Sequence, residues 1–184
     1  DGGPTNEEIF ADSVSNSNRR AVITLDGADW TVLKNLTVSN HAPATGTFYA
    51  YGVHLLHGAD HNIVDGCIIE VDTSASTNFN RAGLILSATN TSATSSGNTG
   101  EYNTFQNNKI HGGYYTLTVM GGNSTDHRLG NRVLNNEISG TYLYGIFHYY
   151  QDGSKIIGNT INLRKNTPTT SGYGIYTFRC DSFT

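Results

Sequence analysis

Three charged residues of this chain are candidates for a catalytic group. Asp65, Lys109 and Glu137 occupy similar places in three related segments. Such a group could support β-elimination with Lys109 as the base. Glycoside hydrolysis would need two carboxylates roughly 5–10 Å apart, but the chain has no Asp-Asp or Asp-x-Asp pair. The three residues also fit an exposed ladder of opposite charges, which stabilises a fold by less than about 1 kcal/mol. We favour the ladder, so enzymatic activity stays open and a non-catalytic protein is predicted.

The segment "HLLHGADH" contains three histidines that could bind a metal, namely His54, His57 and His61. On a helix this spacing would place all three side chains on one face, as a zinc site requires. The surrounding residues instead indicate a strand, a turn and a second strand, which separate the three side chains. We therefore predict no metal site and no cofactor.

A third group of residues is a candidate sugar-binding strip. Five short segments alternate in the same way, and the period of two in a strand predicts an inward row of Val53, Leu84, Leu117, Ile146 and Ile175. The following residues then face outward: His54, Ile85, Thr118, Phe147 and Tyr176. Exposed aromatic rings stack on sugars through their apolar faces. We predict a ligand-binding site with Phe147 and Tyr176 as platforms and His54 as a polar contact. The alternative is that the strip packs against a loop, another chain or another domain.

Two further columns accompany this strip. The residues before the inward row, such as Gly52 and Gly83, are expected to face outward as well. The tyrosines that open four of the segments are expected to stack at a corner and to have a structural role. They are Tyr51, Tyr115, Tyr144 and Tyr173.

A sequence repeat positions all of these residues. "GADWTVLKNLTV" (Gly27–Val38) returns one repeat later as "GADHNIVDGCII" (Gly58–Ile69). The alternating segments begin at Tyr51, Ala82, Tyr115, Tyr144 and Tyr173. Their spacing of roughly 30 residues is typical of stacked coils, whereas a propeller blade needs roughly 40–45 residues. A β-sandwich would require the similarity to be accidental.

Each coil also contains a second block with apolar ends. The later copies are Ile63–Ile68, Phe105–Ile110, Val133–Ile138 and Ile156–Ile161. The first copy is either Val32–Thr37 or Leu33–Val38, and a shift of one residue moves every side chain to the opposite face. The central Asn of three blocks occupies one equivalent position, so we predict a structural ladder of stacked side chains. Its members are Asn108, Asn136 and Asn159.

These observations predict an all-β fold, a parallel β-helix (solenoid) of about five to six coils. The words "NRAVITLDGADWTVLKNLTV" and "YGVHL" resemble right-handed parallel β-helix repeats of the pectin-lyase-like superfamily, over about residues 18–184. They also resemble repeat regions of large secreted surface proteins of bacteria. The resemblance implies a right-handed solenoid and a secreted, extracellular or cell-surface location. We also expect the chain to be a fragment of a longer solenoid. The resemblance also implies a polysaccharide lyase or glycoside hydrolase as an alternative function, whereas polysaccharide as a partner follows from the aromatic strip.

The composition fits one domain over residues 1–184, with a leading segment at 1–17 and a polar, solvated loop excursion at 87–102. The net charge of −4 and the lack of a basic stripe argue against nucleic acid as a partner. No apolar run approaches the roughly 18 residues of a membrane span, so no membrane insertion is predicted. Cys67 and Cys180 lie several coils apart, too far for a disulfide, and are expected to be free thiols.

The sequence thus predicts a non-catalytic module that serves as a rigid spacer or adhesin, with polysaccharide as its candidate ligand. No capping element is evident at either end. Uncovered end coils favour end-to-end self-association or covalent continuation in a larger chain. A filament-forming structural protein is the third function that the sequence leaves open.

Overall fold

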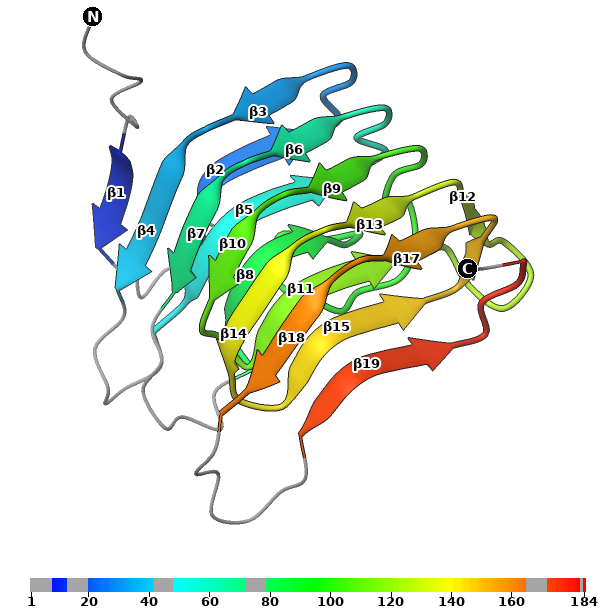
Figure 1. Ribbon diagram of the computed structural model, residues 1–184. Helices are drawn as coiled ribbons and strands as arrows, with labels where there is room; N and C mark the ends of the chain where they lie inside the picture. The colour runs from blue at the N-terminus through cyan, green and yellow to red at the C-terminus, as the bar shows by residue number, and fades with distance from the viewer. Residues whose placement is uncertain (1–7, 13–19, 42–47, 72–78, 165–171, 183) are drawn as a thin grey trace, which may run out of the picture.

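The computed structural model describes residues 8–12, 20–41, 48–71, 79–164, 172–182 and 184. Within these ranges the chain forms strands and turns but no helix, and it winds into a parallel β-solenoid of about five turns (Figure 1). The predicted all-β parallel β-helix is therefore confirmed. Since the described residues form no helix, none of them provides a helical membrane span.

Three parallel sheets form the walls of the solenoid. Sheet I contains the long strands, in the order β19 (Tyr173–Phe178), β15 (Tyr144–Tyr149), β11 (Tyr115–Met120), β8 (Arg81–Leu86), β5 (Ala50–Leu56) and β2 (Ala21–Asp26). Sheet II contains β1 (Glu8–Asp12), β4 (Thr37–His41), β7 (Ile68–Val71), β10 (Lys109–His111), β14 (Glu137–Thr141) and β18 (Thr160–Leu163). Sheet III contains β17 (Lys155–Ile157), β13 (Arg132–Leu134), β9 (Thr104–Gln106), β6 (Ile63–Asp65) and β3 (Val32–Lys34). A two-stranded sheet of β12 (Arg128–Leu129) and β16 (Gln151–Asp152) completes the walls.

Each coil follows the same path through these sheets. It leaves sheet I, passes through a turn into sheet III, bends sharply into sheet II and returns to sheet I (Figure 1). The bend residue has a left-handed backbone in every coil, and it is always Asn or Gly: Asn35, Gly66, Asn107, Asn135 and Gly158. These residue types adopt positive φ at the lowest cost. The bend therefore recurs wherever the sequence provides one of them before a sheet II strand.

The pairing in sheet I agrees with the predicted starts of the long strands. Tyr51 pairs with Ala82, and Tyr115 pairs with both Ala82 and Tyr144. The looser first copy also aligns, since Ala21 pairs with Tyr51. Alignment of the alternating segments thus gave the correct register for this sheet.

The pairing in sheet III determines the register of the first copy of the block with apolar ends and corrects the register of the next copy. Val64 pairs with Phe105, so the segment equivalent to Phe105–Ile110 is Val64–Ile69 and the block predicted at Ile63–Ile68 begins one residue too early. By the same register, the first copy is Leu33–Val38. In the copy predicted at Ile63–Ile68, two consecutive residues are apolar at each end, so the positions of apolar residues could not fix its register. The left-handed bend residue does.

The inward row of sheet I is the centre of the core, as predicted. Each of its first four members is at most 1 % exposed: Val53, Leu84, Leu117 and Ile146. Ile175 continues the row and is 48 % exposed. Apolar side chains from the other two sheets pack against the row, among them Val64, Phe105, Val133, Ile69, Ile110 and Ile138. Burial of each such side chain contributes roughly 1.5–3 kcal/mol.

The small residues of sheet I face inward, not outward as predicted. A Cβ atom built on Gly52 would lie 2.5 Å from Ile69 Cγ2, and one built on Gly83 would lie 2.6 Å from Ile110 Cγ2. In the backbone pairing of sheet I, the residues before and after each of these glycines are paired with the neighbouring strand, but the glycine itself is not. The strand therefore has a local irregularity that turns two consecutive residues toward the core. Strict alternation fails there because period two assumes an undistorted strand.

Substitution in this glycine column is expected to destabilise the fold strongly in the middle and weakly at the end. Gly83→Ala should lower the free energy of unfolding by about 2 kcal/mol, because overpacking a filled core has costs of that size. The new methyl group would also lie 2.6 Å from the carbonyl oxygen of Thr116. Gly174→Ala is the matched control, since nothing lies within 4 Å of its position. Urea unfolding measures both, and equal losses for the two variants would contradict the inward placement.

Part of segment 87–102, around Ala93, packs against the outer face of sheet I, whereas a solvated excursion was predicted for the whole segment. Ala93 is 3 % exposed and belongs to a buried cluster with Tyr51, Ala82 and Ile85. Short polar side chains fold the segment on itself, since Ser95 Oγ accepts hydrogen bonds from the backbone N–H groups of residues 88 and 89. The segment covers the middle coils and hides much of the predicted outward strip.

Both cysteines are free, as predicted. Cys67 is buried and Cys180 is half-buried. Burial raises the pKa of each thiol above its usual value. Both side chains are therefore protonated at neutral pH.

Candidate functional site

The three asparagines of the predicted ladder lie in one column at the bend between sheets III and II. Asn136 Oδ1 accepts hydrogen bonds from the backbone N–H and the side-chain N–H of Asn108, at 3.0 Å each. Asn159 Oδ1 accepts the equivalent two bonds from Asn136, at 2.9 Å each. Each Nδ2 also donates to a backbone carbonyl of an adjacent coil, such as that of Phe105. The column joins successive coils and leaves no polar atom of Asn136 free for a ligand.

A second asparagine column at the turn between sheets I and III was not predicted. Asn103 Oδ1 accepts hydrogen bonds from the backbone and side-chain N–H groups of Asn62, and Asn131 Oδ1 accepts the same two from Asn103. All three side chains are at most 1 % exposed. The signal was present in the sequence, since an Asn directly precedes three of the sheet III strands. The two columns fix both corners of sheet III.

The three candidate catalytic residues do not form one group. Lys109 and Glu137 are paired on neighbouring strands of sheet II. Asp65 lies in sheet III, where its carboxylate is 3.3 Å from Lys34 Nζ and accepts a hydrogen bond from Asn107 Nδ2 at 2.8 Å. The hydrogen bond from Asn107 is the main cause that lowers the pKa of Asp65. Asp65 is thus engaged elsewhere, and the geometry does not support a three-residue charge ladder.

Lys109 and Glu137 line a cleft of about 340 Å³ on the outer face of sheet II. His111 and Ser139 line the same cleft, and His111 Nδ1 lies 2.9 Å from Ser139 Oγ. Among the described residues, Lys109 forms no ion pair. The cleft thus combines the Lys109 amine with a hydroxyl–imidazole pair on an open sheet surface.

His54, the predicted polar contact, is enclosed by the protein. Its side chain is 1 % exposed, and its Nε2 lies 2.8 Å from Ser87 Oγ. Burial, together with the positive charge of Arg20, lowers the pKa of His54 to about 4. The imidazole is therefore neutral at pH 7. A ligand could reach it only after segment 87–102 had moved.

The predicted platforms Phe147 and Tyr176 lie in an aromatic cluster on the outer face of sheet I. Their ring centroids are 5.5 Å apart and their planes differ by 8°. Beside them Tyr144 and Tyr173 stack at 5.2 Å. Phe147 is 8 % exposed. Stacking directs each ring face toward the next ring, whereas a sugar needs an open face. Sugar binding by Phe147 and Tyr176 therefore stays a prediction. The geometry favours a different part of the surface as the binding site.

A second aromatic column follows the turn between sheets I and III. Trp30 and His61 stack with centroids 4.2 Å apart, and His61 and Tyr102 stack at 5.1 Å. Trp30 is 74 % exposed and Tyr102 is 47 % exposed. In the next two coils the same left-handed position is taken by Gly130 and Gly153. The sequence signal was an aromatic residue two positions before each of the first three sheet III strands.

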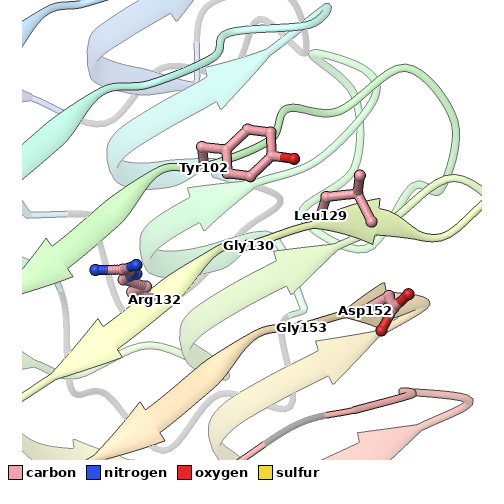
Figure 2. Close-up of a pocket in the computed structure, with 6 residues that line it drawn as sticks. All are labelled: Tyr102, Leu129, Gly130, Arg132, Asp152 and Gly153. Atoms are coloured by element: carbon pink, nitrogen blue, oxygen red, sulfur yellow. The ribbon is translucent and has the colours of Figure 1, made fainter.

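The end of this column opens onto a groove of about 290 Å³. Figure 2 shows Tyr102 on the neighbouring coil above Gly130, with Arg132 on one side and Leu129 and Asp152 on the other. The tyrosine ring touches the backbone of Gly130, since a Cβ atom there would lie 2.5 Å from Tyr102 Cδ1. His61 stacks on one side of the ring and the Gly130 backbone lies against part of the other, and the exposed remainder of the ring lines the groove.

The charged groups of this groove are available to a ligand. Within the part of the chain that the structure describes, neither Arg132 nor Asp152 takes part in an ion pair. The two side chains lie on opposite sides of a floor that carries no side chain, because it is formed by Gly130 and Gly153 (Figure 2). The groove therefore offers a donor, an acceptor and an aromatic ring around an open floor.

No metal site is evident near these surfaces. In the described ranges, no group of three His, Cys, Asp or Glu side chains is arranged to hold a metal ion. The three clustered histidines are separated, as their strand–turn–strand context predicts. His57 Nδ1 lies 2.6 Å from Asp26 Oδ1, His61 lies between two aromatic rings and His54 is buried.

The chain matches no protein-family model, and it has no significant similarity to a curated protein or to a solved structure. What is established is therefore the parallel β-solenoid itself. Membership of the pectin-lyase-like superfamily remains an expectation that follows from the sequence words. The function must be inferred from the surface.

Proposed function

We propose that this protein is a polysaccharide-binding β-solenoid module of a secreted or cell-surface bacterial protein, in which it serves as a rigid spacer or adhesin. One observation carries the binding part of the proposal. The Tyr102 ring borders a groove with a glycine floor, between the Arg132 guanidinium and the Asp152 carboxylate, neither of which is in an ion pair among the described residues. We place the binding site in this groove, which we call the Tyr102 groove.

The chemistry of the Tyr102 groove suits a sugar ring. The C–H groups of a pyranose pack against an aromatic side chain by apolar contact. Its hydroxyl groups both donate and accept, so they can donate to Asp152 and accept from Arg132. The groove volume of about 290 Å³ is at the lower limit for ligand pockets. The groove is therefore of a size for a few sugar units at most.

The solenoid gives this site a stiff support. Tyr102, Gly130 and Gly153 belong to three successive coils, and each backbone N–H donates to a carbonyl of the next coil at 2.8–3.2 Å. The Asn62–Asn103–Asn131 column lies directly beside them in the sequence. Ordered side chains on a rigid frame lose little conformational entropy on binding. This rigidity also supports the role of a spacer.

Replacement of Tyr102 is expected to remove the binding. On an array of immobilised polysaccharides, Tyr102→Ala should lower the affinity for the bound glycan about 10-fold or more, the equivalent of losing about 1.4 kcal/mol. Tyr173→Ala is the matched control, because Tyr173 is 44 % exposed and lies in sheet I. A double variant, Phe147→Ala with Tyr176→Ala, tests the other aromatic strip. The proposal fails if wild-type protein binds no glycan, or if Tyr102→Ala binds as wild type does.

A further inference from the structure

A second cavity adjoins the Tyr102 groove. It has a volume of about 320 Å³ and is lined by Ser124, Thr125, His127, Leu129, Asp152 and Asp181. Two of these residues, Leu129 and Asp152, also line the Tyr102 groove. They belong to the short paired strands β12 and β16. The two cavities are therefore adjacent and share two lining side chains.

The second cavity presents mainly hydrogen-bond acceptors. Asp152 and Asp181 are bridged in register on neighbouring coils, so their side chains project from adjacent positions. His127 Nδ1 lies 3.1 Å from Asp181 Oδ2. The nearby Arg128 is already engaged, since its guanidinium lies 3.3 Å from Asp126 and 3.7 Å from Glu101. Among the described residues that line the cavity there is thus no guanidinium beside its two carboxylates.

This charge pattern selects among sugars. Carboxylates accept hydrogen bonds and repel other carboxylates. A neutral sugar can donate its hydroxyl groups to Asp152 and Asp181, and it can also bond to the hydroxyls of Ser124 and Thr125. A uronic acid placed in the second cavity would instead bring a third negative charge beside these two aspartates. Arg132, the guanidinium among the described lining residues of the two cavities, lies on the far side of the Tyr102 groove (Figure 2).

We infer that the two cavities are consecutive subsites for one neutral oligosaccharide of at least two sugar units, which crosses the wall formed by Leu129 and Asp152. This inference rests on the proposed function and adds the length and the charge class of the ligand. The first unit packs against the exposed part of the Tyr102 ring, beside Arg132. The next unit lies among Thr125, His127 and Asp181. Leu129 is 38 % exposed and provides apolar contact at the junction.

The test is a titration of the intact chain with defined oligosaccharides. The neutral probes are cello-, manno- and chito-oligosaccharides of one to six units, and the anionic probe is trigalacturonate. At least one neutral series should gain 10-fold or more in affinity between one and three units and then level off. Trigalacturonate should bind at least 10-fold more weakly than the neutral trisaccharide. His127→Ala should remove most of the gain in affinity between one and three units, whereas Arg132→Ala should weaken binding of the monosaccharide itself.

Repulsion is tested separately by Asp152→Asn combined with Asp181→Asn, which should raise the affinity for trigalacturonate at least 5-fold. Several results would overturn the inference. They are an affinity that does not depend on length, a preference for trigalacturonate, and no millimolar binding by any neutral series. If polysaccharide binding on the array still depends on Tyr102 in those cases, the proposed function stands and only the two-subsite inference fails. Absence of all glycan binding would overturn both.

Discussion

Acidification from pH 7 to pH 4 is expected to remove roughly 6 kcal/mol of folding stability through two buried histidines. Burial lowers the pKa of His54 and of His148 from 6.5 to about 4. In the unfolded chain both imidazoles regain a pKa near 6.5. Between pH 6.5 and pH 4 the unfolded state therefore binds more protons than the folded state, and stability falls as the pH falls. Each histidine accounts for roughly 3 kcal/mol, and the full stability is present above pH 6.5.

This prediction is checked by urea unfolding at intervals between pH 4 and pH 7.5. A double variant, His54→Gln with His148→Gln, should start from a lower stability at pH 7 but lose much less of it on acidification. His41→Gln is the control, because His41 is exposed and the loss of stability on acidification should persist in this variant. A wild-type stability that is flat between pH 4.5 and pH 6.5 would show that these imidazoles are not buried in neutral form. Asp65, whose pKa is lowered, loses its own contribution only below its ordinary value of 3.8.

Asn136→Ala is expected to lower the free energy of unfolding by about 3–4 kcal/mol, because it leaves buried polar groups without partners. The substitution removes the acceptor of the Asn108 backbone N–H and the donor to the Phe105 carbonyl, both of which lie inside the structure. A buried polar group left without a partner costs about 1–3 kcal/mol. Two backbone groups are affected, and the side-chain bonds to Asn108 and Asn159 are lost in addition. The effect should thus exceed that of an average surface substitution several-fold.

Asn162→Ala is the matched control for this experiment. Asn162 lies in β18 and is exposed, so its replacement should change stability by no more than about 0.5 kcal/mol. Urea unfolding monitored by far-ultraviolet circular dichroism compares the two variants directly. Equal stabilities of the two variants would mean that the Asn136 column does not hold the coils together. Asn103→Ala offers an independent repeat at the other corner, because its side chain has the same pattern of bonds.

Much of the architecture could be predicted because the repeat places the same types of residue at equivalent positions of several coils. The alternating segments predicted the strands of sheet I and their register, and one shared inward row gave the core. Asn108 and its two equivalents indicated a corner where side chains stack. Each of these features depends on residues within a coil or at equivalent positions of adjacent coils. The block predicted at Ile63–Ile68 was wrong by one residue, because the residues next to its apolar ends are apolar as well. Its register is fixed by the left-handed backbone of Gly66, which a pattern of apolar residues does not reveal.

The sequence by itself therefore determined the stacking of coils, the inward row and the places of the bends. Only the tertiary structure decided which outward residues remain open to a ligand. His54 was predicted to be outside, and it is covered because segment 87–102 folds back over sheet I. Tyr102, Arg132 and Asp152 come from three coils, and the groove between them exists because two glycines leave its floor empty. Periodicity depends on local chain geometry, whereas exposure depends on contacts between segments that are distant in the chain.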